Sequence, residues 1–473
     1  NNLGAGSVYN KPESNATQWS LMSYLARINY TLKHKYLFSV NARVDGSSRF
    51  GTNNKYGFFP SASAGWRISE EAFMEPVKEV ISNLKLRASY GFTGNTEIGV
   101  YESLATLGTS NWILGNQLVS GFFPNKIPNP DLKWERTGQF DIGLDLGLFN
   151  NRLRITTDYY KKKTTDLLYS VAVPATSGYQ TMLKNIGSIE NQGYELSIES
   201  DNLTGAFSWT TAFNIAFNRN KVLELGGEEY KEMAEGDGHL KTGSVRRLIV
   251  GEPIGVFYGY RFDGIFQNEE ECKQQTSSAS PIGVGLRRYK DLNGDGKVDA
   301  ANDREILGDA NPKFFGGLTN TFAYKGFELN VFLQYSYGNK ILNYNAMELE
   351  NPTGGQNAYA DMVNRWTPEN PSNIYPKATT NRALLVSDRF IEDGSYLKLK
   401  TLSLSYSFPK INLKHIQGLR LYVTGQNLLT WTKYRGYDPE VSYRGASTLE
   451  AGEDFGGYPQ SRTFMFGIKL DIK

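Results

Sequence analysis

The residue pattern best suited to specific chemistry lies in one acidic segment, DLNGDGKVDAAND at 291–303. Side chains that carry oxygen alternate along it, and Gly296 permits a sharp turn before a backbone carbonyl. Ca²⁺ prefers hard oxygen ligands at loop positions 1, 3, 5, 7 and 9. The predicted ligands are Asp291, Asn293, Asp295, the carbonyl of Lys297, Asp299 and Asp303.

This segment departs from the EF-hand pattern at its end. An EF-hand carries a Glu at position 12, whereas this chain has Asn302 there and the shorter Asp303 one residue later. The alternative is a surface loop that Asx turns close without an ion. A bound Ca²⁺ would stiffen the long external loop 264–312 rather than catalyse, and it is the only cofactor that we expect.

Other reactive residue types do not form a catalytic pattern. The three histidines, His34, His239 and His415, lie far apart, and no GxSxG, HExxH or Walker motif occurs. Carboxylate runs such as 269–271 lie in predicted loops and indicate solvated charge. The single cysteine, Cys272, gives neither a disulfide framework nor a CxxC metal site. We therefore predict that the protein is not an enzyme.

Aromatic residues make up 13% of the chain and fall into two groups. Tryptophans at or near strand ends are predicted to anchor a membrane interface, and they are Trp66, Trp134, Trp209, Trp366 and Trp431. Aromatic residues within predicted external loops are candidate substrate contacts, because rings can stack on sugars. These are Trp112, Tyr258, Tyr260, Tyr344, Tyr359 and Tyr443, and the alternative for each is that it packs its own loop.

Apolar and polar residues alternate with a period of two over segments of about ten residues. Phe327, Leu329 and Val331 share one face of such a segment, and Glu328 and Asn330 lie on the other. A period of two predicts strands, and this length with one apolar face predicts an all-β, antiparallel transmembrane barrel. No run of eighteen apolar residues occurs, and the mean hydropathy is −0.45. A net charge of +2 does not indicate a nucleic-acid partner.

Short and long connections alternate between the predicted strands. Outer-membrane barrels have short periplasmic turns and long external loops, so the long segments 91–135, 162–191, 219–312, 338–395 and 428–460 are predicted to be extracellular. Segment 69–83 is the longest periplasmic connection and is predicted to hold a short helix. The thirteen predicted strands are 20–30, 35–45, 57–68, 84–91, 136–148, 151–162, 192–201, 206–218, 313–324, 326–337, 396–407, 418–427 and 461–472.

The odd strand count has a consequence for the whole protein. A single-chain barrel of this kind has an even number of strands, so we expect this chain to be the C-terminal portion of a larger barrel. The alternative is one more strand within 219–312. The alternation also changes face between Leu399 and Leu402, which predicts a β-bulge near Thr401.

Several motifs resemble the SusC/RagA family of TonB-dependent outer-membrane transporters, and together they span the chain. The resemblance implies a 22-stranded barrel, of which this chain would supply the last thirteen strands, in the outer membrane of a Gram-negative bacterium. It also implies an N-terminal plug, contact with TonB upstream of residue 1, and a SusD-like surface lipoprotein as partner. The motifs are YLFSVNARVDGSSRFGTNNKYGFFPSASAGWRISEE (36–71), LKLRASYGFTGN (84–95), PNPDLKWERT (128–137), NIGSIENQGYELSIES (185–200), YKDLNGDGKVDAANDREILG (289–308), RWTPENP (365–371), DGSYLKLKTLSLSYSFP (393–409) and QNLLTWTKYRGYDPE (426–440).

The expected function is TonB-dependent import of a large nutrient, with an oligosaccharide as the first candidate and a peptide as the second. The barrel exterior would contact outer-membrane lipid. Two alternatives from other classes stay open, namely a soluble, calcium-stabilised β-sheet glycan-binding protein and a diffusion porin. A soluble protein would bury its apolar strand faces in one core, whereas a membrane barrel would expose them to lipid.

Overall fold

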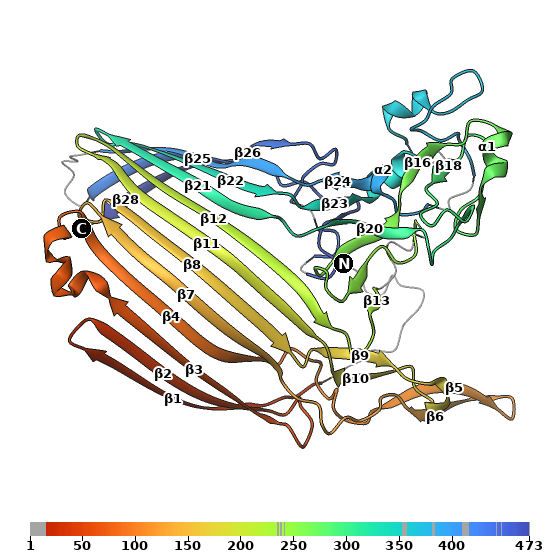
Figure 1. Ribbon diagram of the computed structural model, residues 1–473, viewed down its shortest axis with the longest axis horizontal. Coiled ribbons are helices and arrows are strands. Elements are labelled where there is room, and N and C mark those ends of the chain that lie inside the picture. Colours follow the sequence, from red (N-terminus) through yellow and green to blue (C-terminus); the bar gives the residue numbers. More distant parts are fainter. Residues whose placement is uncertain are drawn as a thin grey trace, which may run out of the picture.

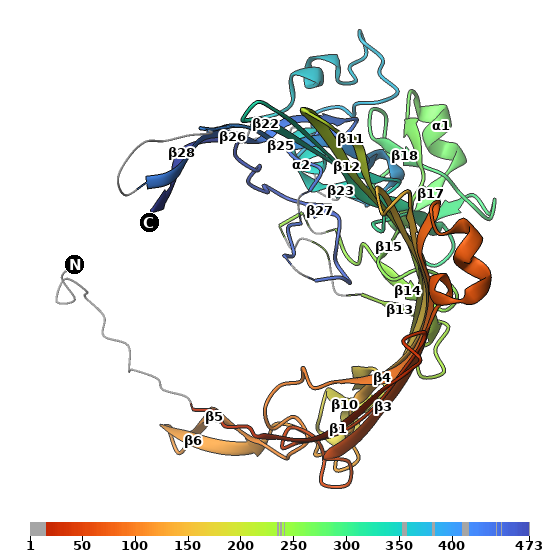
Figure 2. The same ribbon diagram turned by 90° about the vertical axis from the view of Figure 1, so that its left-hand side faces the viewer.

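The computed structural model is a large curved antiparallel sheet with long loops at one end (Figures 1 and 2). It describes residues 16–472 apart from 234–235, 237–238, 241, 352–356, 381–383, 409–415, 441 and 446. The sheet has thirteen strands, each hydrogen-bonded to the next along the sequence. They are β1 (Leu21–Leu32), β2 (Tyr36–Ser47), β3 (Tyr56–Arg67), β4 (Ile81–Asn95), β7 (Glu135–Leu148), β8 (Leu153–Thr165), β11 (Ser188–Thr204), β12 (Phe207–Glu224), β21 (Phe314–Tyr324), β22 (Phe327–Tyr337), β25 (Tyr396–Ser407), β26 (Ile416–Thr432) and β28 (Thr463–Ile472).

The connecting segments carry short elements of their own. Two hairpins project from the sheet, β5 (Leu107–Leu114) with β6 (Gln117–Pro124) and β9 (Leu168–Ala172) with β10 (Thr181–Asn185). The remaining elements are β13 (Tyr230–Glu232), β14 (Arg247–Ile249), β15 (Val256–Tyr260), β16 (Phe262–Ile265), β17 (Thr276–Ser277), β18 (Arg287–Tyr289), β19 (Lys297–Val298), β20 (Arg304–Asp309), β23 (Lys340–Asn343), β24 (Ile391–Asp393), β27 (Glu453–Asp454), α1 (Glu269–Gln274), α2 (Tyr344–Leu349) and the 3₁₀ helices η2 (Ile68–Glu70), η3 (Ala72–Val77), η4 (Ala175–Ser177), η5 (Ala360–Asn364) and η6 (Asp388–Phe390).

The predicted strands are confirmed in number and order, but several are longer than predicted. β11 begins at Ser188 and β12 ends at Glu224, both several residues beyond the predicted limits. In these extensions the outer face carries charged side chains such as Glu190 and Lys221, so the apolar alternation that revealed the strands is lost there. The connection between the predicted strands 192–201 and 206–218 is shorter in the structure, because β11 continues to Thr204 after a register shift.

Apolar residues of successive strands line up on one face, called the outer face below. Val331 of β22 pairs with Leu402 of β25, and Leu404 pairs with Val423 of β26. The side chains of this face are half-buried or exposed, as in Val331 (half-buried) and Leu404 (44% exposed). Because nothing in the described chain covers these side chains, this face is suited to contact lipid. The opposite, inner face carries polar side chains.

The bulge predicted near Thr401 is confirmed. Leu399 pairs with Leu333 and Thr401 pairs with Phe332, so Lys400 is the additional residue between them. The extra residue lets Leu399 and Leu402 occupy the same face although they are three positions apart.

Tight turns join strands at one end of the sheet, the end predicted to be periplasmic. Lys325 and Gly326 have φ of 47° and 89°, the left-handed conformation that a two-residue hairpin needs. The longer connection between β3 and β4 holds η2 and η3, so the predicted short helix is present in 3₁₀ form. In the described part of the chain, no helix combines the length and apolar character needed to cross a membrane.

Candidate transport surface

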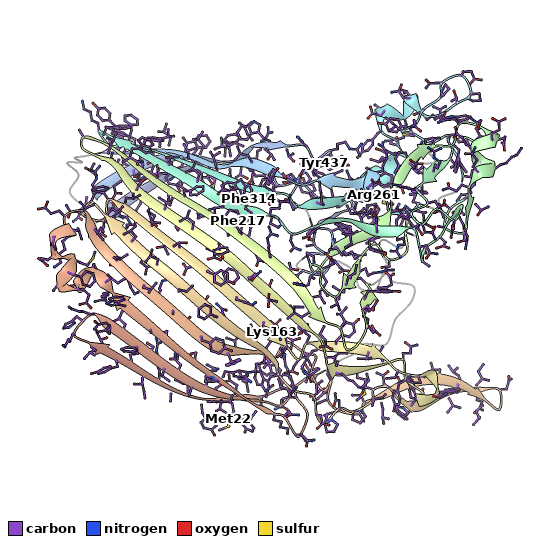
Figure 3. The ribbon with its side chains drawn as sticks, in the orientation of Figure 1. Met22, Lys163, Phe217, Arg261, Phe314 and Tyr437 are labelled. Carbon is purple, nitrogen blue, oxygen red and sulfur yellow. The ribbon has the colours of Figure 1, made fainter. Side chains whose placement is uncertain are left out.

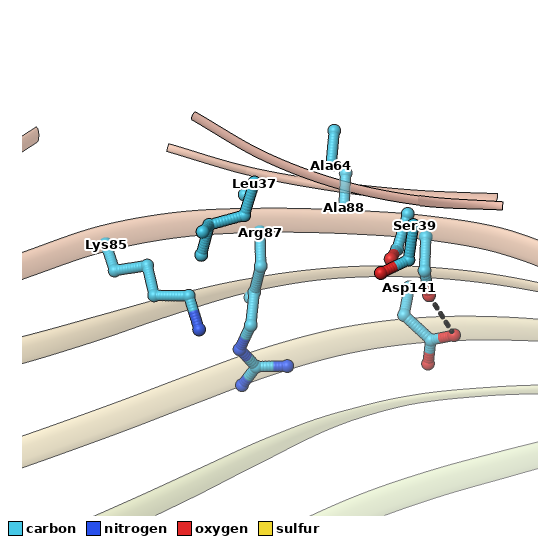
Figure 4. Close-up of a pocket in the computed structure, with 11 residues that line it drawn as sticks. Leu37, Ser39, Ala64, Lys85, Arg87, Ala88 and Asp141 are labelled. Carbon is cyan, nitrogen blue, oxygen red and sulfur yellow. Dashed lines mark hydrogen bonds between the residues drawn. The ribbon is translucent and has the colours of Figure 1, made fainter. Parts of the chain in front are cut away.

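Small residues and charged residues share the inner face of β2, β3, β4 and β7. They surround a cavity of about 270 Å³ in which Ser39, Ser63 and Gly65 leave room for the longer Lys85 and Arg87 (Figure 4). Ser89 donates a hydrogen bond to Asp141 across this surface, at 3.2 Å. Such a wall can hold water and form polar contacts with a solute or with another polypeptide.

Arg87 is the centre of an ion-pair network on this wall. Its guanidinium lies 2.7 Å from an oxygen of Asp158 and 3.3 Å from an oxygen of Asp145. Lys85 approaches Asp145 to 3.7 Å. These four residues come from three neighbouring strands, so the network ties the strands together while it keeps the wall charged.

A second cavity, of about 440 Å³, lies on the inner face at the loop end of the sheet. Arg43 donates to Asp45 at 2.7 Å on its wall, and Asn41 donates to Ser61 at 3.1 Å. Trp134 supplies an apolar side of the same cavity. The inner face therefore stays polar from the loop end into the middle of the strands.

The long loops pack into an assembly with its own buried core. Phe257, Leu342, Met347 and Phe390, from two different long loops, belong to one cluster of buried side chains. Figure 2 shows the segment around β27 on the concave side of the sheet. Loops with a packed core can hold a defined binding surface at the mouth of the sheet.

Buried ion pairs connect loop segments that are distant in sequence. Arg246 is 1% exposed, and its Nε lies 2.8 Å from Oε1 of the buried Glu453. Glu350 accepts from Arg435 and Arg389, each at 2.9 Å. Because a buried carboxylate is costly without a cation beside it, these pairs hold the loops in one arrangement.

One phenol of the same assembly has a strongly perturbed acidity. Burial and a hydrogen bond to Asp454 raise the pKa of Tyr434 well above its ordinary value. The Tyr434 hydroxyl is therefore a permanent hydrogen-bond donor, and it links the end of β26 to β27. This role is structural, because the bond joins two parts of the loop assembly.

The six aromatic substrate candidates do not form one site. Tyr260 and Tyr344 are 5% and 0% exposed and belong to loop cores, so their prediction as stacking surfaces is wrong. Tyr359 packs against the larger core, and Tyr258 lies between Arg247 and Arg304. In these positions the packing alternative holds, because the rings fill space between loop segments.

Two of the candidates remain accessible. Trp112, on the β5–β6 hairpin, is 61% exposed, and Tyr443, near β27, is 41% exposed. Tyr443 contacts Phe455 edge to face, with 5.6 Å between ring centroids. These two stay candidate substrate contacts.

The tryptophans predicted to anchor the membrane interface also fall into two groups, those on the outer face and those held within the fold. Trp66, Trp209 and Trp431 lie on the outer face near strand ends, where a membrane interface would be. Trp134 is instead buried between Phe50 and Phe59, and its Nε1 donates to the Lys55 carbonyl at 3.0 Å. Trp366 belongs to a loop and donates to Gln267 at 3.1 Å. For these two the anchoring prediction is wrong, because each ring is held within the fold.

The acidic loop 291–303 is closed by hydrogen bonds from its own backbone. Asp291 accepts from the amides of Gly294 and Gly296, each at 2.7 Å. Asp303 is fully buried and accepts from Leu292 and Asp299, each also at 2.7 Å. Within the described residues, no group of three or more His, Cys, Asp or Glu side chains is arranged to hold a metal. This geometry is that of the Asx-turn alternative, and calcium binding stays a prediction.

The ion pairs of the wall and the loops are not among the residues predicted from the sequence. The two-residue alternation places Lys85 and Arg87 on the inner face, so this signal could have identified them. No comparable signal exists for Arg246 and Glu453, which are 207 residues apart.

The sheet, with its exposed apolar outer face, polar inner face, short turns and long loops, defines a transmembrane β-barrel wall of the outer-membrane type. The sequence model for "TonB dependent receptor-like, beta-barrel" matches residues 1–428. The chain therefore belongs to the TonB-dependent receptor β-barrel family, within the SusC/RagA group that its motifs resembled. This family consists of outer-membrane transport proteins rather than enzymes.

Sequence similarity to known proteins extends along nearly the whole chain. TonB-dependent receptor P3 of Formosa agariphila is 41% identical and aligns with 99% of this chain and 47% of its own length. TonB-dependent receptor SusC of Bacteroides thetaiotaomicron is 32% identical, over 97% of this chain and 44% of SusC. A solved structure of the RagAB peptide transporter superposes with a TM-score of 0.82 at 28% identity, over 98% of this chain and 49% of that chain. The chain spans about half the length of the curated relatives it matches.

Proposed function

We propose that this chain forms part of the barrel of a TonB-energised outer-membrane importer for nutrients too large for passive diffusion. The observation that carries the proposal is the continuous polar inner face beneath a packed loop assembly. Such a wall can accommodate a plug and a solute, and the loops can form an entry surface. Energy would come from the TonB complex, acting through parts of the protein that precede the barrel.

A SusD-like surface lipoprotein is the proposed partner. The packed loop assembly offers it a defined surface, held by the buried pairs around Glu350 and Glu453. The lipoprotein would cap these loops, so that substrate is enclosed between the two proteins before import. Co-purification of the full-length transporter with the lipoprotein tests this proposal.

An oligosaccharide is the proposed substrate class. The exposed rings of Trp112 and Tyr443 support it, because sugar C–H faces pack on aromatic rings. A peptide is the second candidate, favoured by the 28% identity to RagAB, which is described as a peptide transporter.

Calorimetric titration of the transporter–lipoprotein complex with oligosaccharide and peptide pools separates the two classes. We expect saturable oligosaccharide binding that weakens about tenfold in Trp112→Ala and Tyr443→Ala. Tyr437→Ala is the matched control, because Tyr437 is 79% exposed in the same loop as Tyr443. Binding of peptides alone would overturn the oligosaccharide assignment, and binding of neither pool would contradict the importer proposal.

A further inference from the structure

Paired residues on the outer face of three neighbouring strands form rows that run across the strands. The residue type changes from one row to the next toward the extracellular end. The row nearest the middle of the sheet is aromatic, and the two rows beyond it are mainly cationic. Strand pairing aligns the members of each row directly. On β8, β11 and β12 the rows read Tyr159, Tyr194, Phe217; then Lys161, Gln192, Arg219; then Lys163, Glu190, Lys221.

The cations of these rows, together with Arg136 on β7, form a cluster with excess positive charge. Glu190 is the single carboxylate within the rows, and it pairs with Lys161 at 3.1 Å. In the described chain, no carboxylate lies within ion-pair distance of Lys163, Arg219 or Lys221, and all three side chains are exposed. Like charges this close on one surface favour an anionic ligand.

A groove of about 310 Å³ opens within this cluster between β4, β7 and β8. The guanidinium of Arg136 stacks over the ring of Phe92, 3.7 Å from its centroid. Gly138 forms the floor, and a Cβ there would lie 3.0 Å from the Phe92 ring, so the absent side chain keeps the groove open. Lys161 and Lys163 line the far side, and Figure 3 shows Lys163 near the extracellular ends of the strands.

The aromatic row sets the depth of the groove. Tyr159 and Tyr194 contact each other with 4.8 Å between ring centroids, and they belong to a girdle of outer-face rings. Such a girdle marks the level at which acyl chains meet headgroups. The cationic rows begin immediately beyond it, at headgroup level, and they face away from the inner wall that a transported solute would follow.

We propose that this groove binds the phosphate groups of an acylated glycolipid in the outer leaflet of the membrane. Lys161, Lys163 and Arg136 supply charge-assisted hydrogen bonds to phosphate oxygens. Acyl chains of the same lipid lie against Ile142, which pairs with Tyr159, and the apolar residues below it. The inference rests on the membrane location of the barrel and is independent of the proposed transport function.

The test compares lipid binding to the full-length transporter in nanodiscs. The probes are a phosphorylated acyl-disaccharide, the same lipid without phosphate, and inorganic phosphate. The test variant is Lys161→Gln with Lys163→Gln. The matched control, Lys162→Gln with Lys184→Gln, removes the same charge, because Lys162 lies on the inner face of the same strand and Lys184 lies on β10.

We expect the phosphorylated lipid to bind at least tenfold more tightly than its dephosphorylated form. The test variant should lose most of this preference, while the control variant keeps it. Equal binding of the two lipids, or an equal loss in both variants, would overturn the proposal. Saturation of the groove by inorganic phosphate at the same affinity would assign it to a soluble anion and overturn the lipid assignment.

Discussion

Lys398 and Asp438 form a buried ion pair between the barrel wall and an extracellular loop. The Lys398 Nζ lies 3.1 Å from Oδ1 of Asp438, and the two residues are 1% and 6% exposed. Lys398 also donates to Glu440, which accepts from Lys400 at 3.1 Å. The bulge at Lys400 therefore places two lysines of β25 around one loop carboxylate.

Replacing Lys398 with Met should release the loop that follows β26. The change leaves Asp438 buried without its cation, and breaking a buried pair in this way costs about 3–5 kcal/mol. Hydrogen exchange of the segment around 433–440 should accelerate accordingly, while exchange within the strands stays unchanged. Lys400→Met is the control, because Lys400 is more exposed and its loss should cost at most about 1 kcal/mol. Equal acceleration in both variants would contradict this account.

Deleting Lys400 should be tolerated by the barrel. The deletion removes the extra residue of the bulge, so Leu399 and Leu402 still point outward. Deleting Ser403 is the control, since it would turn Leu404 and Tyr406 toward the polar inner face. We expect heat-modifiable gel migration and normal membrane insertion for the first deletion and their loss for the second. Failure of both deletions to insert would show that the bulge itself is required.

The periplasmic turn before β4 should show a defined pH dependence through Glu71. Hydrogen bonds from Lys35, Tyr36 and Trp66 lower the pKa of this carboxyl from 4.5 to about 2. A depressed folded-state pKa means that the stabilisation is fully present above pH 4.5 and is lost as the pH falls through about 2.

The Tm difference between the parent protein and Glu71→Gln tests this linkage from pH 6 to pH 2. It should be constant above pH 4.5 and should shrink toward zero as the pH approaches 2. Glu70→Gln is the control for loss of a neighbouring charge. A difference that persists unchanged at pH 2 would contradict the linkage.

Calcium binding by loop 291–303 remains a prediction that proteolysis can check. If Ca²⁺ binds, millimolar calcium should slow cleavage of the loop relative to EDTA, and Asp291→Asn with Asp295→Asn should abolish the difference. Both of these side chains accept backbone hydrogen bonds within the loop. Identical cleavage with calcium and with EDTA would leave the Asx turns as the complete explanation of the motif.

The order of residue types along the chain is enough to predict the wall of this protein. A strand shows one face to lipid and one to a polar interior, so its alternation is a local signal that needs no knowledge of its neighbours. This signal identified the thirteen strands, their order and the bulge between Leu399 and Thr401. It weakened at the extracellular ends, where Lys163 and Lys221 replace apolar residues on the outer face.

Contacts between loop residues became visible only in the folded protein. Arg246 and Glu453 are distant in sequence, and no periodicity links a loop arginine to one particular carboxylate. The same limit explains why Tyr344 and Trp112 looked equivalent although one is fully buried and the other is 61% exposed. Burial in a loop depends on how separate segments fold over one another, and this is a non-local property that residue type and spacing do not carry.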